Sequence, residues 1–307
     1  MKIFSCPGCA QVVWFDSTSC EACGVDLAYD PRIDEFVTGV AACSLRETVE
    51  SCNWASTGGT ADLCDCCSLD LDHTADELRR PFQLAKRRTL RQLWILGIDP
   101  ATREPQLRFD LRAGTEAEPV TTGHADGLIT LDTAEAEPSH LQEVRISLGE
   151  PYRTPLGHVR HELGHWWWAA AVDVDFSTEE FRDRFGDESA DYSAALESHY
   201  GGEDDGSWSD DHISFYAASH PWEDVAESFA HVLHILDTFE TATTHRVMTT
   251  DEAPVGFRAI YDRWVPLTLT LNALNRSMGM PDPYPFAASP TAVDKFEFVA
   301  TRLPQLG

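Results

Sequence analysis

Long apolar runs and lysine are both scarce in this sequence of 307 residues. No stretch approaches about eighteen uninterrupted apolar residues, and the first six residues resemble neither an apolar signal core nor a cleavage site. The chain has three lysines, and its 51 acidic and 23 basic side chains give a formal charge of −28. That charge opposes binding to nucleic acid or to an anionic membrane surface. We therefore expect a cytoplasmic protein with no nucleic-acid partner and no membrane partner.

Cysteine is absent after position 67, so all nine cysteines lie in the first quarter of the chain. In a cytosolic protein, cysteines in CxxC pairs are typical of metal thiolates rather than of disulfides. The first four form two such pairs, and glycines beside them permit tight turns that direct backbone amides at sulfur. These four are Cys6, Cys9, Cys20 and Cys23. They predict a zinc ribbon that holds one structural zinc ion.

The other five cysteines predict a second closed site made of thiolates alone. The simplest ligand set is Cys43, Cys52, Cys64 and Cys67, of which the last two again form a CxxC pair. Cys66 is then left over, and Cys66 or His73 could replace one of the four ligands. Because the spacing is wide and irregular, free buried cysteines are the alternative. The sequence thus predicts one or two structural zinc ions.

An HExxH motif, His161-Glu162-Leu163-Gly164-His165, lies in a stretch with helical periodicity. On a helix, two imidazoles four residues apart project from one face, where both can bind one zinc ion. Glu162 then lies beside the ion, and its carboxylate can take a proton from a metal-bound water. The opposite face carries an apolar stripe that predicts a core contact. This stripe consists of Val159, Leu163, Trp167 and Ala170.

A second helix is expected to begin after His220-Pro221 and to supply the third zinc ligand. Four ionisable groups share one stripe of it, and a solvated face is the alternative explanation of that pattern. They are Glu223, Glu227, His231 and His234. Two histidines and Glu223 would leave the fourth zinc position open for water, and Glu227 would hold the free ring nitrogen of a ligand histidine. Glu227 or His231 as the third ligand are the alternatives.

Several motifs resemble those of known zinc peptidases. Tyr216 precedes Glu223 by seven residues, and with the helix Glu223–Phe229 it resembles the active-site segment of gluzincins, where a tyrosine precedes an ExxAE helix. Further motifs are Val120–His124, Gly149–His158, Arg160–His165, Phe185–Glu188, His220–Asp224, Cys52–Trp54 and Ala85–Arg88. Over nearly the whole chain they resemble the bacterial family of zinc-binding metallopeptidases with an N-terminal zinc ribbon. From the expected chemistry we predict a peptide or protein substrate, with the Tyr216 hydroxyl and zinc stabilising the oxyanion. An ordinary half-buried tyrosine is the alternative interpretation of Tyr216.

Together these observations predict an α+β protein with a zincin-like metallopeptidase domain and an N-terminal cysteine-rich module. We expect a zinc ribbon over residues 1–35, a second cysteine-rich zinc module with a connecting helix over 36–96, and the metallopeptidase domain over 97–307. The expected activity is hydrolysis of peptide bonds by a zinc-activated water, with Glu162 as general base. The rival hypotheses are an amidase that acts on a small peptide-like substrate and a non-catalytic, zinc-stabilised interaction module.

Periodicity also predicts individual elements of this fold. Strands are expected at 107–111, 128–131 and 144–148, and helices at 75–96, 191–200, 222–234 and 257–274. The basic face of the first helix is expected to pair with carboxylates of the same chain. The proline-rich stretch 280–286 is expected to be a surface connection.

Overall fold

The computed structural model describes residues 1–48, 51–56, 58, 62–74, 76–115, 118–139, 141, 154–202, 204–248 and 254–306. Its strands all precede residue 133, and the described elements after residue 154 are all helical, which confirms the α+β class. The chain forms two compact units. The first is Met1–Val159 with Thr244–Val247, and the second is Arg160–Thr243 with Met248–Gly307. The three domain boundaries drawn from the sequence stay predictions.

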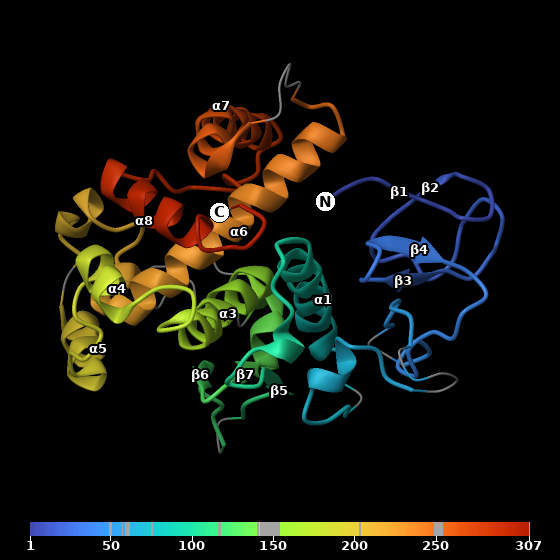
Figure 1. Cartoon of the computed structure of the whole chain (residues 1–307), viewed down its shortest axis with the longest axis horizontal. Helices are drawn as coiled ribbons and strands as arrows, with labels where there is room; N and C mark the ends of the chain where they lie inside the picture. The colour runs from blue at the N-terminus through green and yellow to red at the C-terminus, as the bar shows by residue number, and fades with distance from the viewer. Residues whose placement is uncertain are drawn as a thin grey trace. The chain divides into compact units, whose positions relative to one another are not determined.

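The first unit begins with two antiparallel hairpins, labelled in Figure 1, whose apolar faces form a small aromatic core. The hairpins are β1 (Phe4–Ser5) with β2 (Val12–Val13) and β3 (Ala28–Asp30) with β4 (Glu35–Val37). Tyr29 lies at the centre of this core, with its ring centroid 6.0 Å from that of Phe4 and 5.1 Å from that of Phe15. These strands are too short to be stable alone, so the aromatic packing and the cysteine clusters must hold them.

Helix α1 (Arg79–Ile95) follows the short 3₁₀ helix η1 (Cys67–Leu69) and carries the predicted basic face. The prediction that this face pairs with carboxylates of the chain is confirmed for four of its cations, and most of the face is buried rather than solvated. The pairs are Arg79 with Asp72, Lys86 with Asp70, Arg88 with Asp16, and Arg91 with Asp34. Position 75, where this helix was predicted to begin, lies outside the described residues.

A three-stranded sheet also belongs to the first unit and lies beside α1 (Figure 1). β7 (Leu128–Asp132) is its central strand, paired in parallel with β5 (Arg108–Arg112) and antiparallel with β6 (Gly123–Ala125). Both strands predicted at 107–111 and 128–131 are therefore confirmed, while the strand predicted at 144–148 lies outside the described residues. Two further 3₁₀ helices lie in this part of the chain, η2 (Pro100–Thr102) before β5 and η3 (Thr133–Ala136) directly after β7.

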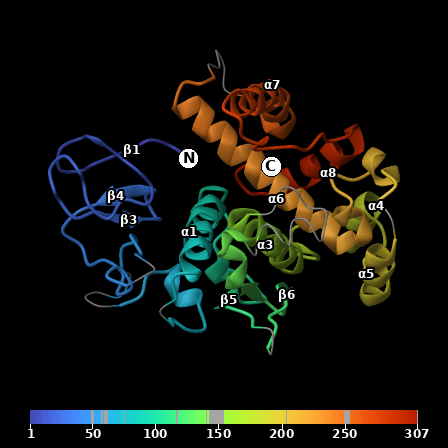
Figure 2. The same cartoon turned by 180° about the vertical axis from the view of Figure 1, so that it is seen from behind.

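Helices make up the second unit. Figures 1 and 2 show the long helix α6 passing α3, with α7 and α8 on its other side. The bounds are α3 (Pro155–Ala171), whose first five residues belong to the first unit, α4 (Thr178–Phe185), α5 (Tyr192–Gly201), η4 (Ser207–Asp210), η5 (Tyr216–Ser219), α6 (Pro221–Thr244), α7 (Gly256–Ser277) and α8 (Pro290–Ala300). The helices predicted at 191–200, 222–234 and 257–274 are thus present. Among the described residues, no helix combines the length and hydropathy that a membrane span requires.

The core of this unit lies where α3 crosses α6. The apolar stripe predicted on α3 is buried along its whole length, from Val159 to Ala170. Trp167 of α3 stacks on Phe229 of α6, with ring centroids 5.3 Å apart and planes at 25°. The apolar stripe thus forms the core side of α3. The other side, which carries the HExxH residues, presents polar groups.

The prediction of a surface connection at 280–286 is wrong at Tyr284. This side chain is 9% exposed, and its ring meets that of Trp264 edge-on at 4.7 Å. The side chain of Asn272 donates a hydrogen bond to the carbonyl oxygen of Tyr284 at 2.7 Å and accepts one from its amide at 3.2 Å. Prolines exclude regular structure from this stretch, but they do not prevent an aromatic residue within it from packing into the core.

Candidate functional site

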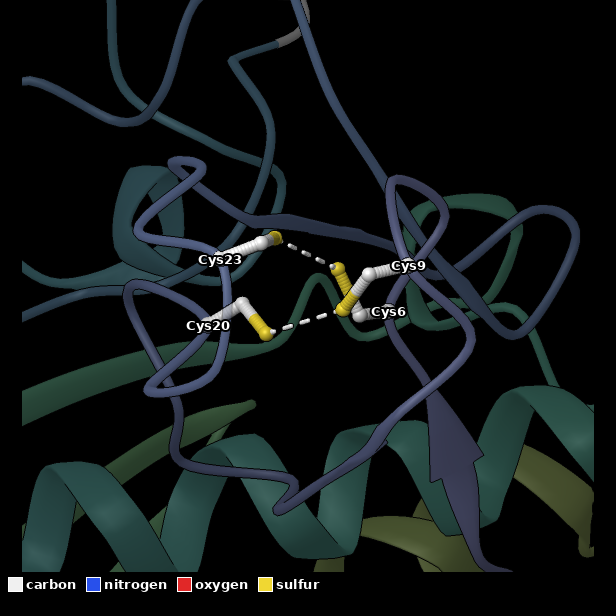
Figure 3. Close-up of side chains that lie close together, drawn as sticks. All are labelled: Cys6, Cys9, Cys20 and Cys23. Carbon is white, nitrogen blue, oxygen red and sulfur yellow. Dashed lines mark hydrogen bonds between the residues drawn. The ribbon is translucent and has the colours of Figure 1, made fainter.

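The first cysteine group brings four sulfur atoms together (Figure 3), two from the turn between β1 and β2 and two from the turn enclosed by the Ser19–Asp26 bridge before β3. These are the sulfurs of Cys6, Cys9, Cys20 and Cys23, which lie within 4.8 Å of one another. Sulfur pairs are 3.7 Å apart for Cys6 and Cys23 and 3.6 Å apart for Cys9 and Cys20. A tetrahedral zinc ion with Zn–S bonds of about 2.3 Å separates its sulfur ligands by about 3.8 Å. The group therefore has the dimensions of a zinc tetrathiolate.

Backbone amides favour the thiolate form in this group. The amide of Gly8 donates to Cys6 Sγ at 3.3 Å, as the glycine in the CxxC turn predicts. The backbone N–H of Cys23 lowers the pKa of Cys20 to about 7. A thiol must lose its proton to bind a metal ion, so both features favour metal binding.

The second cysteine group is buried more deeply and has the same dimensions. It consists of Cys43, Cys52, Cys64 and Cys67, each at most 2% exposed. The sulfurs of Cys52 and Cys64 are 3.6 Å apart, and the amide of Cys67 donates to Cys64 Sγ at 3.4 Å. These are the four ligands that the sequence favours. Cys66 is also buried but is not part of the group, and neither is His73.

The candidate catalytic group joins α3 to α6 and comprises His161, His165 and Glu223. Helical spacing places both imidazoles on one face of α3, and Glu223 lies in the first turn of α6. Glu223 Oε2 is 3.0 Å from His161 Nε2 and 3.4 Å from His165 Nε2, and the two Nε2 atoms are 3.2 Å apart. A tetrahedral zinc ion with bonds of about 2.0–2.1 Å separates such ligands by about 3.3–3.4 Å. The donor set and its spacing fit zinc.

The charges around this group favour a cation. Burial lowers the pKa of His161, but its hydrogen bonds to Glu223 and Glu227 outweigh burial and raise that pKa well above its ordinary value. Burial raises the pKa of Glu223, and the charges and hydrogen bonds of His165 and His161 outweigh it and lower that pKa. Glu223 is 1% exposed, and a carboxylate kept ionised at such depth needs cationic partners. A metal ion supplies the same compensation.

Glu227 lies one turn after Glu223 and contacts the other nitrogen of His161. Its Oε1 is 2.7 Å from His161 Nδ1, and its Oε2 accepts a hydrogen bond from Ser214 Oγ at 3.2 Å. A carboxylate on Nδ1 fixes the tautomer that leaves Nε2 free for a metal ion.

The two histidines of α6 have different hydrogen-bonding partners. His231 Nδ1 lies 2.6 Å from the Tyr284 hydroxyl, and His234 Nδ1 lies 2.6 Å from Arg160 Nη1.

Two further predicted residues lie at this group. Glu162 is 7% exposed, and its Oε2 is buried without a hydrogen-bond partner among the described residues. The Tyr216 ring, in η5 just before α6, lies 5.8 Å from the His161 ring. Burial raises the pKa of Tyr216 far above its ordinary value, and the charge of Glu223 adds to the shift. Tyr216 therefore keeps its proton and can donate a hydrogen bond.

Sequence reasoning missed Tyr192, the first residue of α5. Its hydroxyl donates to Glu223 Oε1 at 2.6 Å. Burial, followed by the charge of Glu223, raises the pKa of Tyr192, so this hydroxyl also stays protonated. The sequence marks α5 only as a short helix, and nothing in its spacing connects Tyr192 to a residue 31 positions later.

The comparisons with known proteins agree with these features. A family described as "Putative zinc-binding metallo-peptidase" matches residues 77–302, and a family described as "zinc-ribbon domain" matches residues 3–42. Proteins from Mycobacterium bovis and from two strains of Mycobacterium tuberculosis, each named an uncharacterized protein, are 37% identical to the chain over 327 residues. These alignments cover 98% of this chain and 95% of each relative. No solved structure matches the chain.

Proposed function

Because the chain belongs to the family described as "Putative zinc-binding metallo-peptidase", we propose that it hydrolyses peptide bonds at a zinc ion held by His161, His165 and Glu223. The observation that carries this proposal is the set of three donor atoms spaced 3.0, 3.2 and 3.4 Å apart. Two imidazoles and one carboxylate leave one tetrahedral position open, as a catalytic site requires. An HExxH pair completed by a downstream glutamate is the gluzincin arrangement.

Glu162 is the general base of this proposal. It follows His161 directly, and its buried Oε2 has no hydrogen-bond partner among the described residues. Such an oxygen is available to accept a proton from the attacking water and to return it to the leaving amine. When bound, zinc supplies a Lewis acid that lowers the pKa of a coordinated water to about 7.

Tyr216 is the candidate oxyanion donor. It is half-buried and keeps its proton, and its ring lies 5.8 Å from that of the ligand His161. A hydroxyl held there can donate to the oxygen that gains charge as the carbonyl is attacked, and loss of one such donor typically costs on the order of 10²-fold or more in rate.

The two cysteine groups have a structural role in this proposal. Four thiolates close the coordination sphere of zinc, which leaves no position for a substrate. The intact protein should thus hold three zinc ions, two structural and one catalytic. We propose a peptide or protein as substrate. The formal charge of −28 still argues against nucleic acid as a partner, and the cytoplasmic location stays a prediction from the sequence.

The variant Glu162→Gln tests the proposal in the full-length, zinc-loaded protein. Its amide cannot take a proton but is nearly the same size, so we expect three zinc ions per chain, an unchanged fold and a fall in peptide cleavage of roughly 10²–10⁴-fold. Glu179→Gln is the matched control, since Glu179 is exposed in the first turn of α4. Cleavage of a peptide library is measured by mass spectrometry. Equal cleavage by Glu162→Gln and the wild type, or a zinc-loaded wild type that cleaves nothing, would contradict the proposal.

A further inference from the structure

Helix α5 has little apolar packing to hold it. None of its residues is buried, and its first turn is capped by Asp191, which accepts a hydrogen bond from the amide of Ala194 at 3.0 Å. A helix of ten residues without a buried face is not stable through its own hydrogen bonds. Its position must therefore depend on a few specific contacts.

One of these contacts is the hydrogen bond from Tyr192 to Glu223. The two oxygens of Glu223 have different partners, because Oε1 accepts from the Tyr192 hydroxyl at 2.6 Å while Oε2 faces both ligand imidazoles. A short hydrogen bond to an ionised carboxylate is among the strong ones. It keeps Oε1 turned away from the position that zinc would occupy.

The ring of Tyr192 is itself held in place. It meets His220 edge-on, with ring centroids 5.2 Å apart, and lies 5.7 Å from the ring of Trp222. His220 Nδ1 accepts from the amide of Trp222 at 3.1 Å, so Nε2 carries the proton and donates to the carbonyl oxygen of Ala190 at 3.2 Å. His220 thus joins the chain before α5 to the first turn of α6, and this aligns Tyr192 with Glu223.

From this geometry we propose that Tyr192 is a positioning residue that restricts Glu223 to binding zinc through Oε2 alone. The proposal rests on the proposed zinc site but not on its activity. If Oε1 were released, the carboxylate would lose its fixed orientation, which weakens its bond to zinc, and on rotation its second oxygen could reach the position that a catalytic site keeps open for water. The hydroxyl of Tyr192 would thereby set both the strength of zinc binding and the access of water.

The test is the zinc affinity of Tyr192→Phe in the full-length protein. Phenylalanine keeps the ring against His220 and removes only the hydroxyl. The zinc ion of this site is identified as the one that His161→Ala loses. In Tyr192→Phe, competition with a chelator should show that this ion is held roughly 10–100-fold more weakly than in the wild type, as is typical when a partner of a metal ligand is removed. The zinc ions of both cysteine groups should be unaffected. With the site saturated by zinc, kcat should fall while KM stays the same, because the open position is obstructed and the peptide contacts are not.

Two further variants make the result specific. Tyr261→Phe is the control, because Tyr261 packs between Phe257 and Trp264 in α7. The zinc affinity of this variant should equal that of the wild type. His220→Asn can still accept from the amide of Trp222 but cannot reach Ala190, so it should bind the third zinc ion more weakly than the wild type and more tightly than Tyr192→Phe. This second variant carries the test if Tyr192→Phe fails to fold.

The outcomes separate this inference from the proposed function. A Tyr192→Phe protein that binds the third zinc ion as tightly as the wild type overturns the positioning role, whether or not the wild type cleaves peptides. A wild type that binds three zinc ions but cleaves nothing contradicts the proposed function, while weaker zinc binding by Tyr192→Phe would still support the positioning role. A wild type that holds only two zinc ions overturns both.

Discussion

Gly164 and Ala226 meet where the two ligand-bearing helices cross. A Cβ atom at Gly164 would lie 2.7 Å from Cα and 2.9 Å from the carbonyl oxygen of Ala226, so only glycine fits there. Gly164 directly precedes His165, and Ala226 lies three residues after Glu223. The same close approach that excludes a side chain at position 164 therefore brings the imidazoles of α3 within reach of the carboxylate of α6.

Replacement of this glycine should weaken both the fold and the metal site. In Gly164→Ala, alanine gains about 1 kcal/mol of helix propensity, but overpacking against a backbone typically costs about 1–3 kcal/mol or more. We expect a lower melting temperature and weaker binding of the zinc ion held by α3 and α6, measured by thermal unfolding and chelator competition. Gly201→Ala is the control, because no atom lies within 4 Å of the Cβ position there. Equal behaviour of the two variants would show that the crossing tolerates a side chain.

A glutamine at position 227 separates the two glutamate assignments of the third ligand. Glu227 contacts Nδ1 of His161, the nitrogen that faces away from Glu223 and His165. We therefore expect Glu227→Gln to keep the third zinc ion with an affinity reduced roughly 10–100-fold, and Glu223→Gln to lose it. Zinc content after dialysis against a weak chelator measures both. If the Glu227→Gln protein alone lost the ion, Glu227 would be the ligand.

The parts of the site that were predicted from the sequence are those fixed by short-range geometry. The spacing of four positions from His161 to His165 places both imidazoles on one helical face whatever the rest of the chain does. The same spacing places Glu223 and Glu227 on one face of α6. The same holds for the CxxC turns, where local backbone geometry directs amides at sulfur.

The parts that were missed depend on contacts between distant segments. Tyr192 reaches Glu223 from a helix whose own pattern shows no core face, and no periodicity records such a contact. The prediction at Tyr284 failed for the same reason, since its pocket is formed by α6 and α7 rather than by its neighbours in sequence. The cations of α1 were predicted to have partners, but their burial is set by where those partners lie in space.

Substitutions at two adjacent cysteines, Cys66 and Cys67, should have different effects on the zinc content. Cys67 belongs to the group of four, whereas Cys66, which is equally buried, does not. Cys67→Ser should lose one zinc ion per chain and much of the stability, because binding of structural zinc is coupled to folding. Cys66→Ser should keep all three ions. Metal counting by mass spectrometry distinguishes them, and a lost ion in Cys66→Ser would place Cys66 among the ligands instead.

Asp34 is the centre of a charge cluster that joins the hairpins to α1. Arg91 Nε and Nη2 donate to its two oxygens at 2.8 and 3.1 Å, the Tyr29 hydroxyl donates at 2.7 Å, and Lys2 Nζ lies 3.1 Å away. Burial raises the pKa of Asp34, but the hydrogen bonds and charge of Arg91 outweigh burial and lower it. A carboxyl whose pKa is lower in the folded protein stabilises the fold above its unfolded value of about 3.9.

That stabilisation should disappear in acid. Asp34→Asn removes the negative charge that Arg91, which is 2% exposed, faces in this pair, and disruption of a largely buried ion pair typically costs about 3 kcal/mol near neutral pH. The difference in unfolding free energy between wild type and variant should shrink as the pH falls through the lowered pKa of Asp34, because the wild-type carboxyl then takes up its proton. Urea unfolding of both proteins between pH 7 and pH 2 measures this difference. Asp65→Asn, which breaks an exposed pair with Arg32, should cost less than about 1 kcal/mol. A difference for Asp34→Asn that stays constant over the whole pH range would show that hydrogen bonding, not charge, holds this cluster.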